Sequence, residues 1–309
     1  MNEPAITATD LAKSFRGGVI AVNGLDLSVP RGAVYGLIGR NGAGKTTTLR
    51  MLMGLLRPVR GTAQVLGHDL WSAPRAVRQR VTYVSQEQQL PAAKCTAELC
   101  LDFSKLHERW DFGLAGKLAK RFGIRVDAPM AALSGGEQRK VAVLLAFAAR
   151  PDVLVLDEPA AGLDPIARRH LIEEIVEFLG DGGERTVLFS THIIEDLERV
   201  AEHVGIMDRG RMVAAGRLED LQTGMRRVQL IFNDHAVPDG FRLPGAVRCR
   251  TEGPVLTAVV RIDTPAQLEA LRATPDARVA DFPLGLQDLF IELLDQPLET
   301  PLFNPAQGL

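Results

Sequence analysis

Short apolar runs alternate with longer amphipathic segments over the first two thirds of the chain. Four runs are β-branched or leucine-rich and occupy residues 33–39, 81–85, 153–157 and 186–190. Continuous apolar runs of this length are typical of strands buried on both faces of a parallel sheet. Asp164-Pro165 supplies a helix cap and a proline at the first helical position before one amphipathic segment. The pattern predicts an α/β domain over residues 1–223.

The pattern changes after about residue 224. Three strand-like runs surround one predicted helix and occupy residues 228–232, 255–262 and 278–282. Thr264 and Gln267 form a capping sequence at the start of that helix. A last helix is indicated by an apolar stripe consisting of Leu286, Leu289, Phe290, Leu293 and Leu294. We therefore predict a small accessory α/β domain over 224–309, with a loosely ordered tail after Asp295.

Composition narrows the possible functions. A net charge of −2 over 309 residues gives no global electrostatic reason to bind nucleic acid or membrane lipids. The three cysteines make no C-x-x-C pair, and we interpret them as reduced, buried thiols of a cytoplasmic protein. The longest apolar run, 141–149, is too short to cross a bilayer, and the N-terminus lacks a signal segment. We expect a soluble chain whose membrane role, if it has one, depends on a partner.

A glycine-rich segment carries the strongest chemical signal. "GRNGAGKT" at 39–46 fits G-x-x-x-x-G-K-[ST], and it follows a predicted strand and opens a helix, which is the context of a P-loop. In such a loop backbone N–H groups surround phosphates, Lys45 holds the β- and γ-phosphates, and Thr46 binds Mg²⁺. The predicted nucleotide-binding residues of this segment are Gly39, Asn41, Gly42, Gly44, Lys45, Thr46 and Thr47.

Two carboxylates end the predicted strand at 153–157. Asp157 is placed to support Mg²⁺, and Glu158 is placed to orient or polarise an attacking water. Paired acids at a strand end can also cap a helix. A P-loop in the same domain favours the catalytic interpretation.

A second helix N-terminus has the features of an anion site. Ser134 and Glu137 form a capping box, S-x-x-E, directly before an apolar helix. Gly135 and Gly136 leave the backbone of the first turn bare. Exposed N–H groups at a helix start bind anions readily.

Taken in order, these motifs resemble the ATP-binding subunits of ABC transporters over about residues 5–220. "LSGGE" at 133–137 is similar to the family's signature motif, which implies that Ser134, Gly135 and Gly136 face the nucleotide held by a second copy of the domain. A chain with one P-loop and one signature then forms two composite sites as a head-to-tail dimer.

The resemblance implies roles for three further residues. Gln86 matches the glutamine that senses the γ-phosphate and joins Thr46 and Asp157 at the metal. His192 matches the switch histidine and acts with Glu158 in catalysis. Phe15 lies where the family places an aromatic ring against adenine.

The resemblance also implies cofactors and partners. ATP and Mg²⁺ are the expected ligands, and the expected partners are a second ATPase subunit, in a homodimer, and an integral membrane permease, with no nucleic acid. A helical subdomain at about 87–150 would contact the permease at the inner face of the cell membrane. "RWD" at 109–111, "GLDP" at 162–165 and the C-terminal "LGLQDLFIELLD" resemble the exporter branch for drugs, antibiotics or lipids.

Other kinds of ATP-binding protein fit the sequence to different degrees. The ATPase of an importer would share every ATP-site residue. A regulatory protein that binds ATP without hydrolysing it would be favoured if Glu158 were missing, and it is present. ABC proteins of the translation-factor type carry two ATP-binding cassettes in one chain, whereas this chain has one P-loop and one signature motif. Chromosome-organising or repair ATPases split the cassette with a long coiled coil, whereas only residues 87–133 separate Gln86 from Ser134 here.

Overall fold

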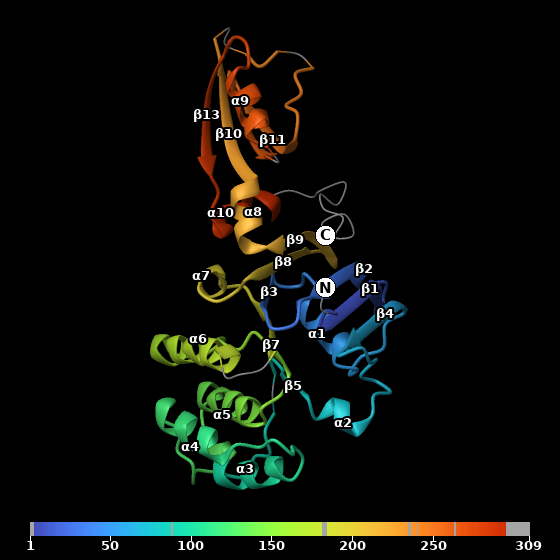
Figure 1. The fold of residues 1–309 in the computed structure, drawn as a ribbon, viewed down its shortest axis with the longest axis vertical. Helices are drawn as coiled ribbons and strands as arrows, with labels where there is room; N and C mark the ends of the chain where they lie inside the picture. The colour runs from blue at the N-terminus through green and yellow to red at the C-terminus, as the bar shows by residue number, and fades with distance from the viewer. Residues whose placement is uncertain are drawn as a thin grey trace. The chain divides into compact units, whose positions relative to one another are not determined.

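The computed structural model describes residues 3–87, 89–180, 184–233, 236–238, 240–262 and 264–294. The chain divides into two compact units, Met1–Met212 and Val213–Leu309 (Figure 1). The boundary expected from the sequence, at residue 224, falls at the end of helix α8 (Leu218–Gly224) in the second unit. A domain boundary at that residue stays a prediction.

A largely parallel sheet is built around the first unit's four predicted strands. Its strand order is β5-β6-β7-β3-β8-β9, and the strands are β3 (Val34–Gly39), β5 (Val81–Val84), β6 (Val153–Asp157), β7 (Thr186–Thr191), β8 (His203–Asp208) and β9 (Arg211–Arg217). The pairs β5–β6, β6–β7, β3–β7 and β3–β8 are parallel, which confirms the prediction. Every residue of β3, β6 and β7 is buried, as their continuous apolar sequences require.

The parallel register brings four loops to one edge of this sheet. Asp157 pairs with Ser190, and Ile38 pairs with Thr191. Because the carboxyl ends of parallel strands lie at the same edge, the segments after β3, β5, β6 and β7 leave the sheet together.

A three-stranded antiparallel sheet was not predicted. Its order is β2-β1-β4, and its strands are β1 (Ile6–Ser14), β2 (Ile20–Val29) and β4 (Arg60–Val65). β1 and β4 mix polar and apolar positions, and register shifts interrupt the pairing of β1 with both neighbours. Irregular pairing of this kind breaks the strict alternation by which half-buried strands are found.

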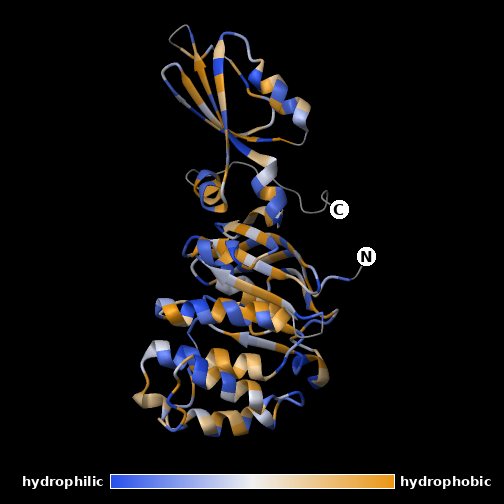
Figure 2. Cartoon of the chain, turned by 60° about the vertical axis from the view of Figure 1, so that its left-hand side comes forward, coloured by the Kyte–Doolittle hydropathy of each residue, from blue (hydrophilic) through white to orange (hydrophobic). Residues whose placement is uncertain are grey.

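Helices complete the first unit. They are α1 (Lys45–Leu52), α2 (Arg75–Arg78), α3 (Thr96–Ser104), α4 (Phe112–Arg121), the 3₁₀ turn η1 (Met130–Ala132), α5 (Gly135–Ala148), α6 (Pro165–Gly180) and α7 (Ile194–Glu198). Asp164 caps α6 as predicted, because its Oδ1 accepts a hydrogen bond from the Ala167 N–H at 2.8 Å. In Figure 2 the longer helices carry both hydrophobic and hydrophilic residues, as expected of helices with one buried and one exposed face.

The second unit has a core of its own. Its antiparallel sheet has the order β11-β12-β10-β13, with strands β10 (Met225–Phe232), β11 (Ala246–Glu252), β12 (Val255–Arg261) and β13 (Ala277–Pro283). Side chains from β10 and β12 form a buried cluster with Leu271 of α9 (Pro265–Arg272). The capping box at Thr264 and the leucine stripe of α10 (Leu286–Leu294) are confirmed, whereas β11 was not predicted.

The cysteines differ from expectation. All three are free, but Cys95 and Cys100 are half-buried and Cys249 is exposed. The expectation of buried thiols is therefore wrong for Cys249, which lies on β11 at the edge of the second unit's sheet. The tail predicted to be loose lies outside the described residues. Within the described part of the chain, no helix has the length and apolar content needed to cross a membrane.

Candidate active site

The P-loop has the backbone geometry that its glycines predict. Gly42 and Gly44 adopt φ of 82° and 103°, in the left-handed region that favours glycine. A Cβ on Gly39 would lie 2.5 Å from the Met207 carbonyl oxygen, and one on Gly44 would lie 2.4 Å from the Ala21 carbonyl oxygen. The loop therefore has no room for a side chain at Gly39 or Gly44. It leads directly into α1, and the first N–H groups of a helix are suited to binding phosphate.

Lys45, the first residue of α1, is buried despite its charge. Its Nζ donates to the Gly39 carbonyl oxygen at 2.7 Å and lies 3.3 Å from Glu158 Oε1. The side chains of Lys45 and Glu158 are each only 7% exposed. A buried cation beside bare loop backbone fits the binding of an anionic phosphate group.

Glu158 lies between a predicted phosphate-binding residue and a predicted catalytic residue. One carboxylate oxygen faces Lys45, and the other lies 2.7 Å from Nδ1 of His192, an exposed residue that follows β7. Glu158 itself adopts φ of 50°, and its N–H donates to Ser190. A non-glycine residue held in the left-handed region costs free energy, and such strain is concentrated at functional sites.

Asp157 lies at the centre of a set of hydroxyl groups. Its Oδ1 accepts from Thr46 Oγ1 at 3.2 Å and from Ser190 Oγ at 2.6 Å, and its Oδ2 accepts from the Tyr83 hydroxyl at 3.2 Å. Hydroxyl and carboxylate oxygens are ligands that Mg²⁺ prefers, and Mg²⁺ is usually held by one or two carboxylates together with substrate phosphates. The donor set therefore fits the predicted metal.

Gln86 is exposed just beyond β5, and its loop is tied to α5. The Arg139 guanidinium donates to the carbonyl oxygen of Ser85 at 3.0 Å and also to that of Gln86. Burial holds the pKa of Arg139 below its ordinary value, while the charges of Asp157 and Glu158 oppose that shift. This arginine therefore links α5 to the Gln86 loop.

Ser134, the N-cap of α5, is exposed, as is Gly135. The predicted capping box is confirmed: Ser134 N donates to Glu137 Oε2 at 2.8 Å, and Ser134 Oγ accepts from the Glu137 N–H at 3.3 Å. The contacts of Ser134 are therefore with its own helix rather than with the P-loop.

The start of α5 packs against the loop before α6. A Cβ on Gly136 would lie 2.6 Å from the Gly162 carbonyl oxygen. One turn further on, Lys140 Nζ contacts Asp164 Oδ2 at 2.9 Å. Helix α5 and the "GLDP" loop are thus held together by close backbone contact and an ion pair.

Phe15 is exposed at the turn between β1 and β2. The residue is 46% exposed, and Lys13 Nζ lies 5.7 Å from the ring centroid. The adjacent strand β2 contributes the Ala21 carbonyl that packs against Gly44 of the P-loop. This places the aromatic hairpin beside the P-loop, as stacking on a nucleotide base would require.

Three residues of the site were missed from the sequence. They are Tyr83, Ser190 and Arg139. Ser190 was detectable in principle, because two parallel strands with acidic and hydroxyl residues at their ends bring these side chains together in register. Tyr83 and Arg139 lie within an ordinary strand and helix sequence, where nothing local distinguishes them.

Comparison with known proteins decides the family. A family model described as ABC transporter matches residues 22–161. A Nod factor export ATP-binding protein I from Ralstonia nicotianae is 35% identical, over 94% of both chains. A daunorubicin/doxorubicin resistance ATP-binding protein from Streptomyces peucetius is 34% identical, over 96% of this chain and 94% of that protein. The chain belongs to the ATP-binding subunits of ABC transporters. It is accordingly an ATPase.

Solved structures agree with this family. An ATP-binding subunit of an ABC transporter superposes with a TM-score of 0.64 at 28% identity, covering 71% of this chain and 92% of that one. A dimeric ATP-binding cassette bound to ADP and phosphate superposes with a TM-score of 0.61 over 69% of this chain and 98% of that one. At 19% identity, this second similarity shows the fold alone.

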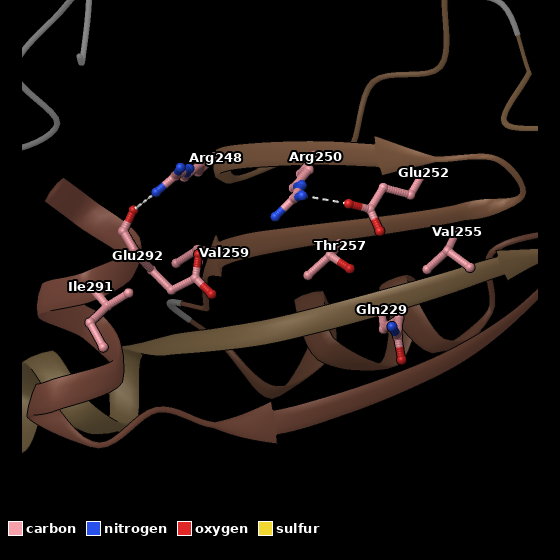
Figure 3. Close-up of a pocket in the computed structure, with 9 residues that line it drawn as sticks. All are labelled: Gln229, Arg248, Arg250, Glu252, Val255, Thr257, Val259, Ile291 and Glu292. Atoms are coloured by element: carbon pink, nitrogen blue, oxygen red, sulfur yellow. Dashed lines mark hydrogen bonds and ion pairs between the residues drawn. The ribbon is translucent and has the colours of Figure 1, made fainter. Parts of the chain in front are cut away.

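The ABC subunit also contains a cavity unrelated to the P-loop. It has a volume of about 440 Å³, lies on the second unit's sheet, and is lined by residues of β10, β11, β12 and α10 (Figure 3). Its two arginines are engaged, because Arg248 donates to the Glu292 carbonyl oxygen and Arg250 pairs with Glu252 at 2.5 Å. None of the predicted ATP-site residues lines this cavity.

Proposed function

We propose that this ATPase works as a homodimer and drives export through a separate integral membrane permease. The observation that carries this proposal is the extent of the similarity to a Nod factor export ATP-binding protein and to a drug-resistance ATP-binding protein. The matches run over 94% and 96% of this chain, so they include the second unit as well as the ATPase unit.

In the proposed dimer each nucleotide is enclosed from two sides. The P-loop of one subunit, with Lys45 and the open start of α1, holds the phosphates. The exposed start of α5 in the other subunit, at Ser134 and Gly135, meets the γ-phosphate from the opposite side. Two positive helix ends on one anion explain why ATP would hold the dimer together and why hydrolysis would release it.

The chemistry of this proposal is assigned to Glu158 and His192. Glu158 acts as the general base that orients and polarises the attacking water, and His192, at hydrogen-bond distance from Glu158, holds that carboxylate in place. Thr46, Gln86 and Asp157 would hold Mg²⁺, which would supply charge neutralisation at the phosphates. Phe15 stacks on the adenine ring, and Asn41 and Thr47 complete the phosphate loop.

The permease would contact the helical part of the first unit, at the inner face of the cell membrane. Large apolar side chains are exposed there, at Leu101 and Leu106 in and after α3 and at Phe112 in α4. An exposed apolar group of this kind fits a protein partner better than it fits water.

Reconstitution tests the direction of transport. The tagged chain is purified from detergent-solubilised membranes, and the membrane protein that copurifies with it is reconstituted with it in vesicles. With the ATPase subunits facing the bath, ATP should drive a lipophilic fluorescent dye into the lumen, and Glu158→Gln should abolish this movement. ATP-driven movement out of the lumen, or a need for an added substrate-binding protein, would support an importer and overturn the proposal.

A further inference from the structure

The carboxylate of Asp157 is fixed by donors from three different elements. Thr46 on α1 and Ser190 on β7 both bind Oδ1, whereas Tyr83 on β5 binds Oδ2. The proposed mechanism gives Thr46 and Asp157 a task at the metal but leaves the tyrosine hydroxyl without one. Its hydrogen bond nevertheless engages the second carboxylate oxygen, Oδ2.

The sheet register explains how Tyr83 reaches Asp157. Tyr83 pairs with Val155 in the parallel β5–β6 ladder. Val155 lies two residues before Asp157, and side chains two residues apart in a strand project from the same face. A tyrosine at this register position is long enough to extend along that face to the carboxylate at the strand end.

The tyrosine hydroxyl is itself supported from α1. Arg50 makes a side-chain hydrogen bond with Tyr83. Arg50 follows Thr46 by one helical turn, so both side chains lie on the same side of α1. Helix α1 therefore reaches Asp157 twice, directly through Thr46 and indirectly through Arg50 and Tyr83.

The Tyr83 hydroxyl donates to a carboxylate rather than to a neutral acceptor. A protonated hydroxyl beside an ionised carboxylate makes a charge-assisted hydrogen bond, which is stronger than a neutral one.

We propose that Tyr83 is a positioning residue for the metal site: its hydroxyl holds Oδ2 of Asp157 and so fixes the plane of the carboxylate that supports Mg²⁺. With one oxygen held by Thr46 and Ser190 and the other by Tyr83, the group cannot rotate about its Cβ–Cγ bond. The inference rests on the proposed function in one respect, namely that Asp157 supports Mg²⁺.

The test is Tyr83→Phe, which removes one hydroxyl and keeps the ring that packs in the sheet. Tyr35→Phe is the matched control, because Tyr35 is the chain's other tyrosine, is buried on β3 and stacks on His203 away from Asp157. The readout is the affinity for a fluorescent ATP analogue, measured with a chelator and then with increasing Mg²⁺. Thermal unfolding of each variant reports on the fold.

We expect Tyr83→Phe to bind the analogue with normal affinity in the presence of chelator. It should need about 10–100 times more Mg²⁺ to reach half of the metal-dependent change in that affinity, which is the usual effect of losing a hydrogen-bond partner of a metal ligand. Tyr35→Phe should match the wild type. An unchanged Mg²⁺ requirement in folded Tyr83→Phe would overturn the inference.

Asp157→Asn separates this inference from the function on which it rests. If Asp157→Asn raises the Mg²⁺ requirement and Tyr83→Phe does not, Asp157 supports the metal but Tyr83 does not position it. If neither variant raises it, the assignment of Asp157 to the metal is wrong as well.

Discussion

Lys45 and Glu158 face each other in the interior of the site, with Nζ 3.3 Å from Oε1 and each side chain only 7% exposed. One residue is assigned to the phosphates and the other to the attacking water. A buried ion pair is stable only while both charges have partners. Under the proposed roles, phosphate bound to Lys45 would compete with Glu158, and nucleotide binding would be linked to the release of the Glu158 carboxylate.

Glu158→Gln tests this link. The amide cannot act as a base, so turnover should fall by a factor on the order of 10²–10⁴. ATP binding should be retained, because the negative charge that competes for Lys45 is gone. ATP-bound dimers should then accumulate on size exclusion. Glu195→Gln is the control, because the Glu195 side chain is 70% exposed and makes a 3.6 Å surface ion pair with Arg168. Hydrolysis by Glu158→Gln at the wild-type rate would show that the base lies elsewhere.

The ion pair between α5 and the "GLDP" loop predicts a lowered pKa for Asp164. Hydrogen bonds from the Ala167 N–H, the Lys140 ammonium and the Ile166 N–H lower the pKa of Asp164 from 3.8 to about 2. The charged carboxylate is therefore favoured in the folded protein. Its stabilising effect is complete above the ordinary pKa and is lost as the pH falls through the lowered value.

An NMR titration of the Asp164 carboxyl carbon checks this expectation. Lys140→Gln should move the pKa of Asp164 upward. Lys105→Gln should leave it unchanged, because Lys105 is 75% exposed and its ionic contact is with Asp102. An Asp164 that titrates at 3.8 in the wild type would mean that the ion pair and the helix cap are not formed in solution.

The part of the chain after Gly224 should be dispensable for nucleotide binding. A chain ending at Gly224 keeps β9 and α8 and removes the sheet that has its own buried core. We expect this shortened chain to fold and to bind ATP with the affinity of the full chain, as measured by circular dichroism and by titration with a fluorescent analogue. Loss of both folding and binding would show that the boundary is misplaced or that the units share a core.

The fold was predictable where the sequence pattern is continuous. The apolar runs at 33–39 and 153–157 became the buried strands β3 and β6, because a parallel strand covered on both faces needs apolar residues throughout. β4 and β11 were not found, because edge strands with polar residues such as Arg60 and Arg250 lack that pattern.

Site residues were predictable where a local motif fixes their spacing. They were not predictable where only tertiary contacts bring a residue into the site. Lys45, Thr46 and Asp157 follow from local motifs, and the structure brings them together with Glu158 and His192. The left-handed conformation of Glu158 and the contacts of Tyr83 and Arg139 depend on how strands and helices meet. No local sequence signal encodes that arrangement.

Mixing two variants tests whether each ATP site is shared between two copies of this chain, as we propose. Ser134→Arg places a bulky cation at the start of α5 and also removes a helix cap, which costs about 1 kcal/mol. Its monomer should still bind ATP, because the P-loop is intact, but its homodimer should not hydrolyse it. Lys45→Ala should be inactive because its own P-loop binds nucleotide weakly.

In a mixed dimer one site carries both lesions and the other carries none. The measurement is the ATPase rate of an equimolar mixture of Ser134→Arg and Lys45→Ala. With a shared site the rate should recover to about one quarter of that of the wild type, because half of the dimers formed at random are mixed and each keeps one of its two symmetric sites. No recovery on mixing, or folded Ser134→Arg monomers that no longer bind ATP, would contradict the shared site.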